Sequence, residues 1–165
     1  GQTLQTRPEE TYRALIEGTA YGARVIIERF EEYGVHIEEV INCGGIAEKN
    51  PMLMQIYADV TNRTMKISRS AQTPALGAAM FGAVAAGPEN GGYATVHEAQ
   101  AAMGGLKERE FVPIPENVKV YEKLFRMYKE LHDIFGTKEY TANLYHIMKD
   151  LLDLRDAVRE GREIS

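Results

Sequence analysis

Two short apolar runs, each followed by a helix-forming segment, constrain the fold of this 165-residue chain more than any other feature. The first contains Val40, Ile41 and Cys43 and ends in two glycines, and the second, 64–68, alternates as a half-buried strand does. Between them, the apolar residues over 50–60 recur at helical spacing. Strands joined through a helix are typical of a parallel sheet, whose crossover is right-handed in nearly all proteins. We therefore expect an α/β fold.

Apolar spacing and end signals predict further helices around these strands. Thr6 with Glu9 and Thr95 with Glu98 have capping-box spacing, which is typical of helix starts. The helix over 73–86 consists largely of alanine and glycine, and we expect it to be buried and closely packed. The predicted helices besides 50–60 cover about 6–34, 73–86, 95–104, 115–136 and 140–154.

The balance of strands and helices is unusual. Two parallel strands beside about six helices make a poor independent sheet, because both sheet edges stay exposed. We therefore expect the remaining strands in sequence that precedes residue 1, with residues 1–165 forming one helix-rich domain.

Charge and composition argue against several classes of protein. The net charge of −5 and the absence of a Lys/Arg block argue against nucleic acid as a partner. The longest uncharged stretch, 70–88, is mostly alanine and too weakly apolar for a membrane span. A single cysteine, Cys43, excludes an internal disulfide, and we expect it to be buried. No secretory signal is visible, so we expect a soluble protein of the cytoplasm.

The segment 43–51, CGGIAEKNP, is the strongest chemical candidate. Gly44 and Gly45 lack the Cβ atom that would keep a ligand from the backbone, and the N–H groups of the following helix could hold a phosphate or a base edge. As a bare motif the turn is more often structural. Lys49 has two interpretations, a phosphate contact or a solvated lysine. Asn50 has a structural role as N-cap.

Other catalytic patterns are missing from the sequence. The histidines, His36, His97, His132 and His146, lack the spacing of metal ligands, and one cysteine cannot make a CxxC site. No Asp-x-Gly-Thr turn is present to handle Mg²⁺ and phosphate. Phosphoryl transfer also needs a positioned base, so we expect neither catalytic nor metal-binding residues in this segment.

The chain resembles the C-terminal lobe of the FGGY carbohydrate kinases over nearly all its length, and most closely those members that act on ribulose. The resemblance is carried by TLQTRPEETYRALIEGTAYGARVIIERF, CGGIAEKNPMLMQIYADVTNRTMKI, QTPALGAAMFGAVAAG and FVPIPENVKVYEKLFRMYKELHDIFG. It implies the end of a ribonuclease-H-like lobe, as in actin-like ATPases. Within this lobe, 1–87 would be the nucleotide-contacting part and 88–165 a helical extension.

The resemblance also implies a function and site residues. The whole enzyme would transfer the γ-phosphoryl group of ATP to ribulose, with ATP contacts here at Gly44, Gly45, Ile46, Ala47 and Asn50. The catalytic aspartate, the sugar pocket and the Mg²⁺ ligands would lie outside this segment, so the segment alone should be inactive.

Two alternatives stay open. The same lobe could belong to a family member that acts on xylulose, gluconate or glycerol. The chain could instead be a noncatalytic helical module for interaction or oligomerisation, because amphipathic helices with few strands fit that as well. A homodimer is a further expectation that the sequence does not decide.

Overall fold

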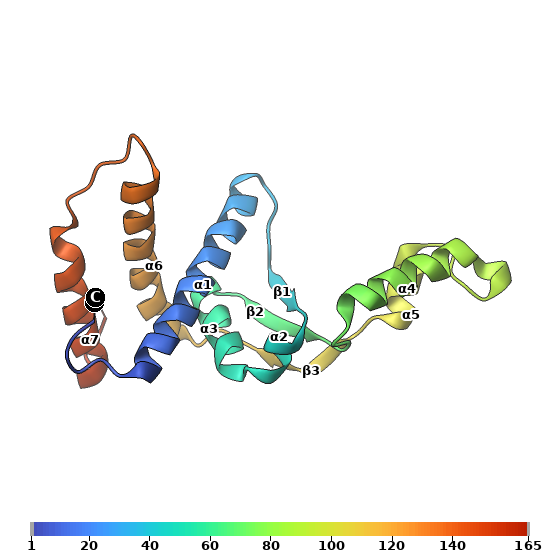
Figure 1. The fold of residues 1–165 in the computed structure, drawn as a ribbon, viewed down its shortest axis with the longest axis horizontal. Helices are drawn as coiled ribbons and strands as arrows, with labels where there is room; N and C mark the ends of the chain where they lie inside the picture. Colours follow the sequence, from blue (N-terminus) through green and yellow to red (C-terminus); the bar gives the residue numbers. More distant parts are fainter. Residues whose placement is uncertain (1, 165) are drawn as a thin grey trace. The chain divides into compact units, whose positions relative to one another are not determined.

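The computed structural model describes residues 2–164. The chain divides into two compact units (Figure 1). The helical unit consists of Gly1–His36, Asp59–Asn62 and Pro113–Ser165, and the sheet unit consists of Ile37–Ala58 and Arg63–Val112. The predicted single domain with its functional boundary at residue 87 stays a prediction.

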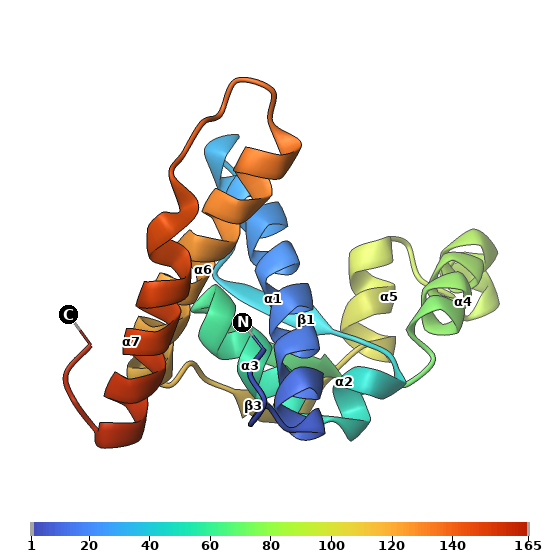
Figure 2. The ribbon, with the colours of Figure 1, turned by 60° about the vertical axis from the view of Figure 1, so that its left-hand side comes forward.

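The helical unit is built from three long helices. They are α1 (Pro8–Glu32), α6 (Pro115–Gly136) and α7 (Ile147–Glu160), with the short 3₁₀ helix η2 (Leu144–His146) before α7. Figure 2 shows α6 and α7 beside each other. The start of α1 is stabilised by Glu10, whose carboxylate accepts the backbone N–H of Arg7 at 2.8 Å. After α1 the chain turns at Gly34, whose φ of +82° suits glycine.

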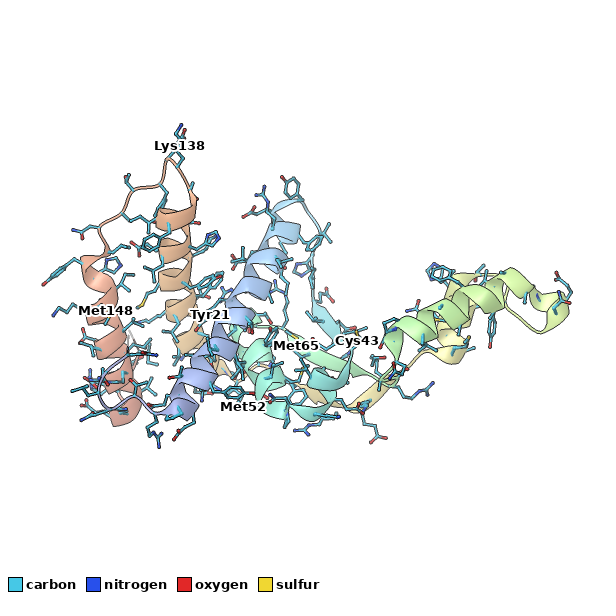
Figure 3. The ribbon with its side chains drawn as sticks, in the orientation of Figure 1. Tyr21, Cys43, Met52, Met65, Lys138 and Met148 are labelled. Atoms are coloured by element: carbon cyan, nitrogen blue, oxygen red, sulfur yellow. The ribbon has the colours of Figure 1, made fainter. Side chains whose placement is uncertain are left out.

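Aromatic side chains between α1 and α6 form the centre of the helical unit. The ring of Tyr21, labelled in Figure 3, lies 6.3 Å from the ring of Tyr121 and 5.3 Å from that of Tyr128. Arg24 adds polar contacts: its guanidinium lies 4.0 Å above the Phe125 ring and donates to Glu122 at 2.6 Å. Aromatic contacts and a paired arginine together tie α1 to α6.

The sheet unit contains three strands, four helices and one 3₁₀ helix among the described residues. In chain order they are β1 (Glu39–Asn42), α2 (Gly45–Lys49), α3 (Pro51–Thr61), β2 (Thr64–Ser68), α4 (Thr73–Ala86), η1 (Pro88–Asn90), α5 (Val96–Met103) and β3 (Leu106–Phe111). The last residues of α3 fall in the helical unit. β1 and β2 are parallel, with Val40 opposite Met65, which confirms the predicted parallel pair.

The third strand corrects the expectation of only two strands. β3 pairs antiparallel with β2, with Phe111 opposite Met65, and gives the sheet order β1-β2-β3. Its sequence, LKEREF, lacks apolar alternation, and only Phe111 is buried. Charged side chains are common on edge strands because they discourage further pairing. The pairing of β3 therefore depends on its backbone and on Phe111, and hydrophobic periodicity does not reveal it.

The core of the sheet unit lies between the sheet and α3. Met54 and Ala58 of α3 pack with Met65 and Ile67 of β2 and with Phe111 of β3. Figure 3 labels Met65 at this position. These side chains alternate along β2, as expected for a strand with one buried face. Ala47, in the segment that follows β1, belongs to the same core cluster.

Two helix predictions were wrong in part. The helix α4 has the predicted bounds, but none of its residues is buried among the described residues. It lies against α5 and against the following loop, where Tyr93 donates its N–H to the Ala83 carbonyl at 3.2 Å. The final helix begins at Ile147, not near Tyr140, because Asn143 caps the 3₁₀ turn and its side chain accepts from the N–H of Tyr145.

The start of the first helix is displaced from the predicted capping box. Thr6 instead accepts the N–H of Thr3 at 2.8 Å, and α1 begins one residue later than a Thr6 cap would give. No helix among residues 2–164 is long and apolar enough to cross a membrane.

Candidate functional site

The backbone just after β1 has a conformation that requires glycine. Gly44 has φ 88° and ψ 170°, a region that is almost restricted to glycine. Gly45 begins α2. A methyl group added at either position would meet no heavy atom of another part of the chain within 4 Å. The predicted turn is therefore present, and its backbone is open on the side where side chains would stand.

The next two residues face opposite environments. The side chain of Ile46 is 68% exposed, whereas that of Ala47 is 7% exposed and packs in the core with Met54 and Phe111. A ligand at this turn could therefore contact the side chain of Ile46, whereas Ala47 has little exposed surface.

Asn50 has the structural role that its position predicts. Its side-chain oxygen accepts the N–H of Leu53 at 3.0 Å, which caps the start of α3. Its own N–H donates to the carbonyl of Ile46 at 2.9 Å, which closes the end of α2. Asn50 therefore joins the two helices, and its proposed contact with a nucleotide stays a prediction.

The helix after the glycines differs from the expected one. The sequence predicted a turn leading into a helix at Pro51, whereas the structure has α2 (Gly45–Lys49) before α3. A helix of five residues aligns few peptide dipoles, and a helix this short is marginal in isolation. The feature that remains for binding is thus the bare backbone of the turn.

An ion pair attaches α2 to the sheet. The ammonium group of Lys107 on β3 donates to the carboxylate of Glu48. This hydrogen bond, with the accompanying charge attraction, lowers the pKa of Glu48 below its ordinary value. Lys49 is exposed, and neither of its two interpretations is tested.

A groove of about 660 Å³ opens at the carboxyl ends of the parallel strands. Ile41 of β1 and Cys43, the residue after β1, line the groove, and so does Ser68 at the end of β2. Figure 3 labels Cys43 at the end of β1. The predicted burial of Cys43 is wrong, since the thiol is exposed and faces this groove. Ligands in open α/β sheets commonly bind at this end of the strands.

The opposite wall of the groove comes from residues that were not among the predicted site residues. Gly77 of α4 lies there with His97 and Gln100 of α5. The small residues of α4 were recognised as a feature that permits close approach, but the spacing of His97 and Gln100 carries no recognisable motif. Pairing of β3 with β2 brings α5 to the groove, and this pairing was not predicted.

Arg69 fixes one end of the groove. Its backbone N–H donates to the carbonyl of Gly105 at 2.9 Å, and its guanidinium donates to the carbonyl of Gly104 at 2.7 Å. A Cβ at residue 105 would lie 2.9 Å from the guanidinium carbon. Glycine at this position therefore leaves room for the Arg69 guanidinium against the start of β3.

The described residues do not fit a metal centre. Over 2–164, no three His, Cys, Asp or Glu side chains lie close enough together to hold a metal ion. The expectation that Mg²⁺ ligands lie outside this segment stays a prediction, and no chemical step is assigned to a metal here.

Comparisons with known proteins agree on one family. The family model for the C-terminal domain of the FGGY family of carbohydrate kinases matches residues 1–86. The ribulokinase of Geobacillus thermodenitrificans is 54% identical over 163 residues, which cover 99% of this chain and 28% of that protein. The ribulokinase of Bacillus licheniformis is 55% identical over 156 residues, 94% of this chain and 27% of that protein. The chain thus spans little more than a quarter of these relatives.

Solved structures have a similar fold. The ligand-bound xylulose kinase from Lactobacillus acidophilus superposes with a TM-score of 0.69 at 23% identity, covering 84% of this chain and 27% of that one. The xylulose kinase from Rhodospirillum rubrum gives a TM-score of 0.66 at 23% identity over 80% of this chain and 26% of that one.

Proposed function

This chain belongs to the FGGY family of carbohydrate kinases, and we propose that it forms part of an enzyme that transfers the γ-phosphoryl group of ATP to ribulose. The product would be ribulose 5-phosphate. Identity of 54% with a ribulokinase over 99% of the chain is the observation that carries this proposal. Because the chain corresponds to only 28% of that relative, the activity is assigned to the longer protein.

The part proposed for this chain is contact with the adenosine of ATP. The bare backbone of Gly44 and Gly45 supports this, because a flat base or a ribose can approach a backbone that carries no Cβ. Ile46 offers an exposed apolar side chain beside it, and Asn50 lies at the far end of α2. The proposed contact at Ala47 is limited to the 7% of this residue that is exposed.

The adjoining groove supplies space for the same ligand. Its volume, about 660 Å³, is within the range of sites that hold small molecules and cofactors. Apolar groups such as Ile41 and Met80 line it, and His97 and Gln100 can form hydrogen bonds. Cys43 belongs to the groove and directly precedes the glycine turn. The groove therefore ends at the residue next to the turn, and we infer that a nucleoside contacts both.

The chemistry of phosphoryl transfer is assigned to other parts of the protein. Such transfer needs a base for the attacking hydroxyl and positive charge around the phosphates, which Mg²⁺ supplies when it is bound. This chain would act by binding: it would hold the adenosine so that the triphosphate extends toward those groups. Positioning alone contributes several kcal/mol to such reactions, roughly 7 to 11 in favourable cases.

The proposal also covers the rest of the sheet, the cellular compartment and the partners of the protein. β1 lies at the edge of the three-stranded sheet, and we infer that strands from another part of the protein extend this edge into a ribonuclease-H-like lobe. We also infer action in the cytoplasm, no nucleic-acid or membrane partner, and a homodimer as the assembly to test first. The net charge of −5 supports the first exclusion.

The exposure of α4 favours one alternative. None of its residues is buried, so this uncharged helix could dock onto another protein in a noncatalytic module. The two proposals differ at the glycine turn, because only the kinase needs a nucleotide there.

The test uses the protein encoded by the complete reading frame. Consumption of ATP is measured with ribulose, xylulose, gluconate and glycerol as acceptors. We expect the highest kcat/KM with ribulose, and no turnover by residues 1–165 alone. A higher kcat/KM with another acceptor would replace the substrate, and absence of ATP consumption with all four would overturn the kinase assignment.

A further inference from the structure

The position of α2 depends on a few contacts with the rest of the sheet unit. The helix has only five residues, Gly45–Lys49, and such a short helix gains little stability from its own hydrogen bonds. Ala47 anchors it in the core, and the N–H of Asn50 bonds to the Ile46 carbonyl at its end. A further attachment is the ion pair between Glu48 and Lys107.

The strand β3 supplies two of these contacts. Its register against β2 shifts between Leu106 and Glu110, so the contacts themselves, and not strand alternation, place Lys107 and Phe111 against α2. Phe111 packs in the core cluster that contains Ala47, and Lys107 pairs with Glu48. Consecutive residues of α2 are therefore fixed to β3, one by apolar packing and the other by charge.

We propose that Lys107 is a positioning residue for nucleotide binding, because its ammonium group holds Glu48 and thereby sets the orientation of the Gly44–Gly45 turn. This inference rests on the proposed function. Gly44 has no side chain and Gly45 makes no contact that a Cβ would disturb, so the turn has no side-chain anchor of its own. Its orientation follows that of α2.

The charge state of the pair supports this role. Lys107 lowers the pKa of the Glu48 carboxyl, so the carboxylate stays ionised below the pH at which a free glutamate is protonated. The Glu48 carboxylate is thus ionised at neutral pH. The energy of the ion pair is small because the two side chains are 33% and 36% exposed. We therefore expect an effect on ligand affinity and little effect on folding.

The sheet unit contains a matched control pair. Lys66 of β2 pairs with Glu39 of β1, and the two side chains are 29% and 45% exposed. This pair also joins two segments of the sheet, but neither residue belongs to α2. Loss of either ion pair should change stability by a similar amount, whereas only loss of the Lys107 pair should change nucleotide binding.

The experiment compares variants of the protein from the complete reading frame. Lys107→Met and Glu48→Gln break the pair, Glu48→Lys with Lys107→Glu reverses it, and Lys66→Met serves as the control. We expect Lys107→Met to raise KM for ATP about fivefold, the upper end for an exposed ion pair. The KM for the sugar, kcat and Tm should stay close to those of the unsubstituted protein.

The reversed pair and the control decide the interpretation. Reversal should restore KM for ATP to within about twofold, because opposite charges still meet across the same gap. Lys66→Met should leave KM for ATP unchanged. An unchanged KM for ATP in Lys107→Met, or an equal rise in Lys66→Met, overturns the positioning role. Absence of ATP-dependent turnover in the unsubstituted protein overturns the proposed function and this inference with it.

Discussion

Substituting the two glycines by alanine separates backbone strain from ligand contact. At Gly44 the φ of 88° and ψ of 170° are almost closed to alanine, so Gly44→Ala should lower the free energy of unfolding by about 1 to 3 kcal/mol. Gly45 is helical and has open space around the added methyl group. Gly45→Ala should therefore leave stability unchanged or raise it by up to about 1 kcal/mol.

Both methyl groups should nevertheless weaken nucleotide binding. Each would occupy the open side of the turn, where the adenosine is proposed to lie. Forcing an extra methyl group into a packed contact costs roughly 1 to 3 kcal/mol, which corresponds to a rise of about 5-fold to 150-fold in the Kd for ATP. Gly45→Ala is the more informative variant, because its effect on affinity comes without a loss of stability.

The assay measures two quantities on the same preparations. Urea denaturation gives the change in unfolding midpoint, and titration with ATP by calorimetry gives Kd. The reasoning is refuted if Gly45→Ala binds ATP as tightly as the unsubstituted protein does. It also fails if Gly44→Ala is as stable as Gly45→Ala, because the strain assigned to the turn would then be absent.

Three further predictions concern the helical unit. Asp59 is 2% exposed and accepts the N–H of Ile114 at 2.8 Å, so Asp59→Ala should lower the free energy of unfolding by about 2 to 4 kcal/mol in urea denaturation, and an equally stable variant would contradict this. Burial raises the pKa of Tyr121 from 10.0 to about 12, and this difference stabilises the folded protein below pH 10. Stability should fall as the pH rises from 10 to 12. Tyr121→Phe should reduce that fall in urea midpoints measured across this pH range. Arg24→Met should lower the free energy of unfolding by about 2 to 3 kcal/mol, because it breaks the hydrogen bond to Glu122. Arg24→Lys should not restore this stability, because lysine lacks the planar group that bonds several partners. Full recovery of stability with lysine would show that charge alone suffices.

Elements with strong local signals were predictable from the sequence. The helix α6 begins at Pro115 and ends at Gly136 as predicted, because proline suits the first helical position and apolar residues follow at helical spacing. The strand β2 was predicted over 64–68, since its alternation places Met65 and Ile67 in the core. In both elements the local pattern agrees with the burial that the fold requires.

Elements that depend on distant partners were not predictable. The strand β3 has charged residues at four of its six positions, and it is recognised only by its pairing with β2. The burial expected for α4 was wrong because composition indicates a preference for contact but does not supply the partner. Exposed apolar side chains such as Phe81 on α4 are consistent with a partner that the described residues lack.

The candidate site was predictable in part. The glycine pair has the conformation and the open space that the sequence suggested, because Gly44 supplies the positive φ of the turn and neither residue carries a Cβ. The helix α2, the groove beside Cys43 and the contact of Glu48 with Lys107 were missed. Each of them requires β3 or α5 to be placed against residues far away in the sequence.

Hydrogen–deuterium exchange at the glycine turn tests the central claim most directly. The protein from the complete reading frame is compared with and without saturating ATP analogue, and the sugar alone serves as control. If adenosine lies against the backbone at 44–47, the amides of this segment should exchange more slowly with the nucleotide and at the same rate with the sugar. Unchanged exchange at 44–47 in the nucleotide-saturated protein would contradict the proposed site.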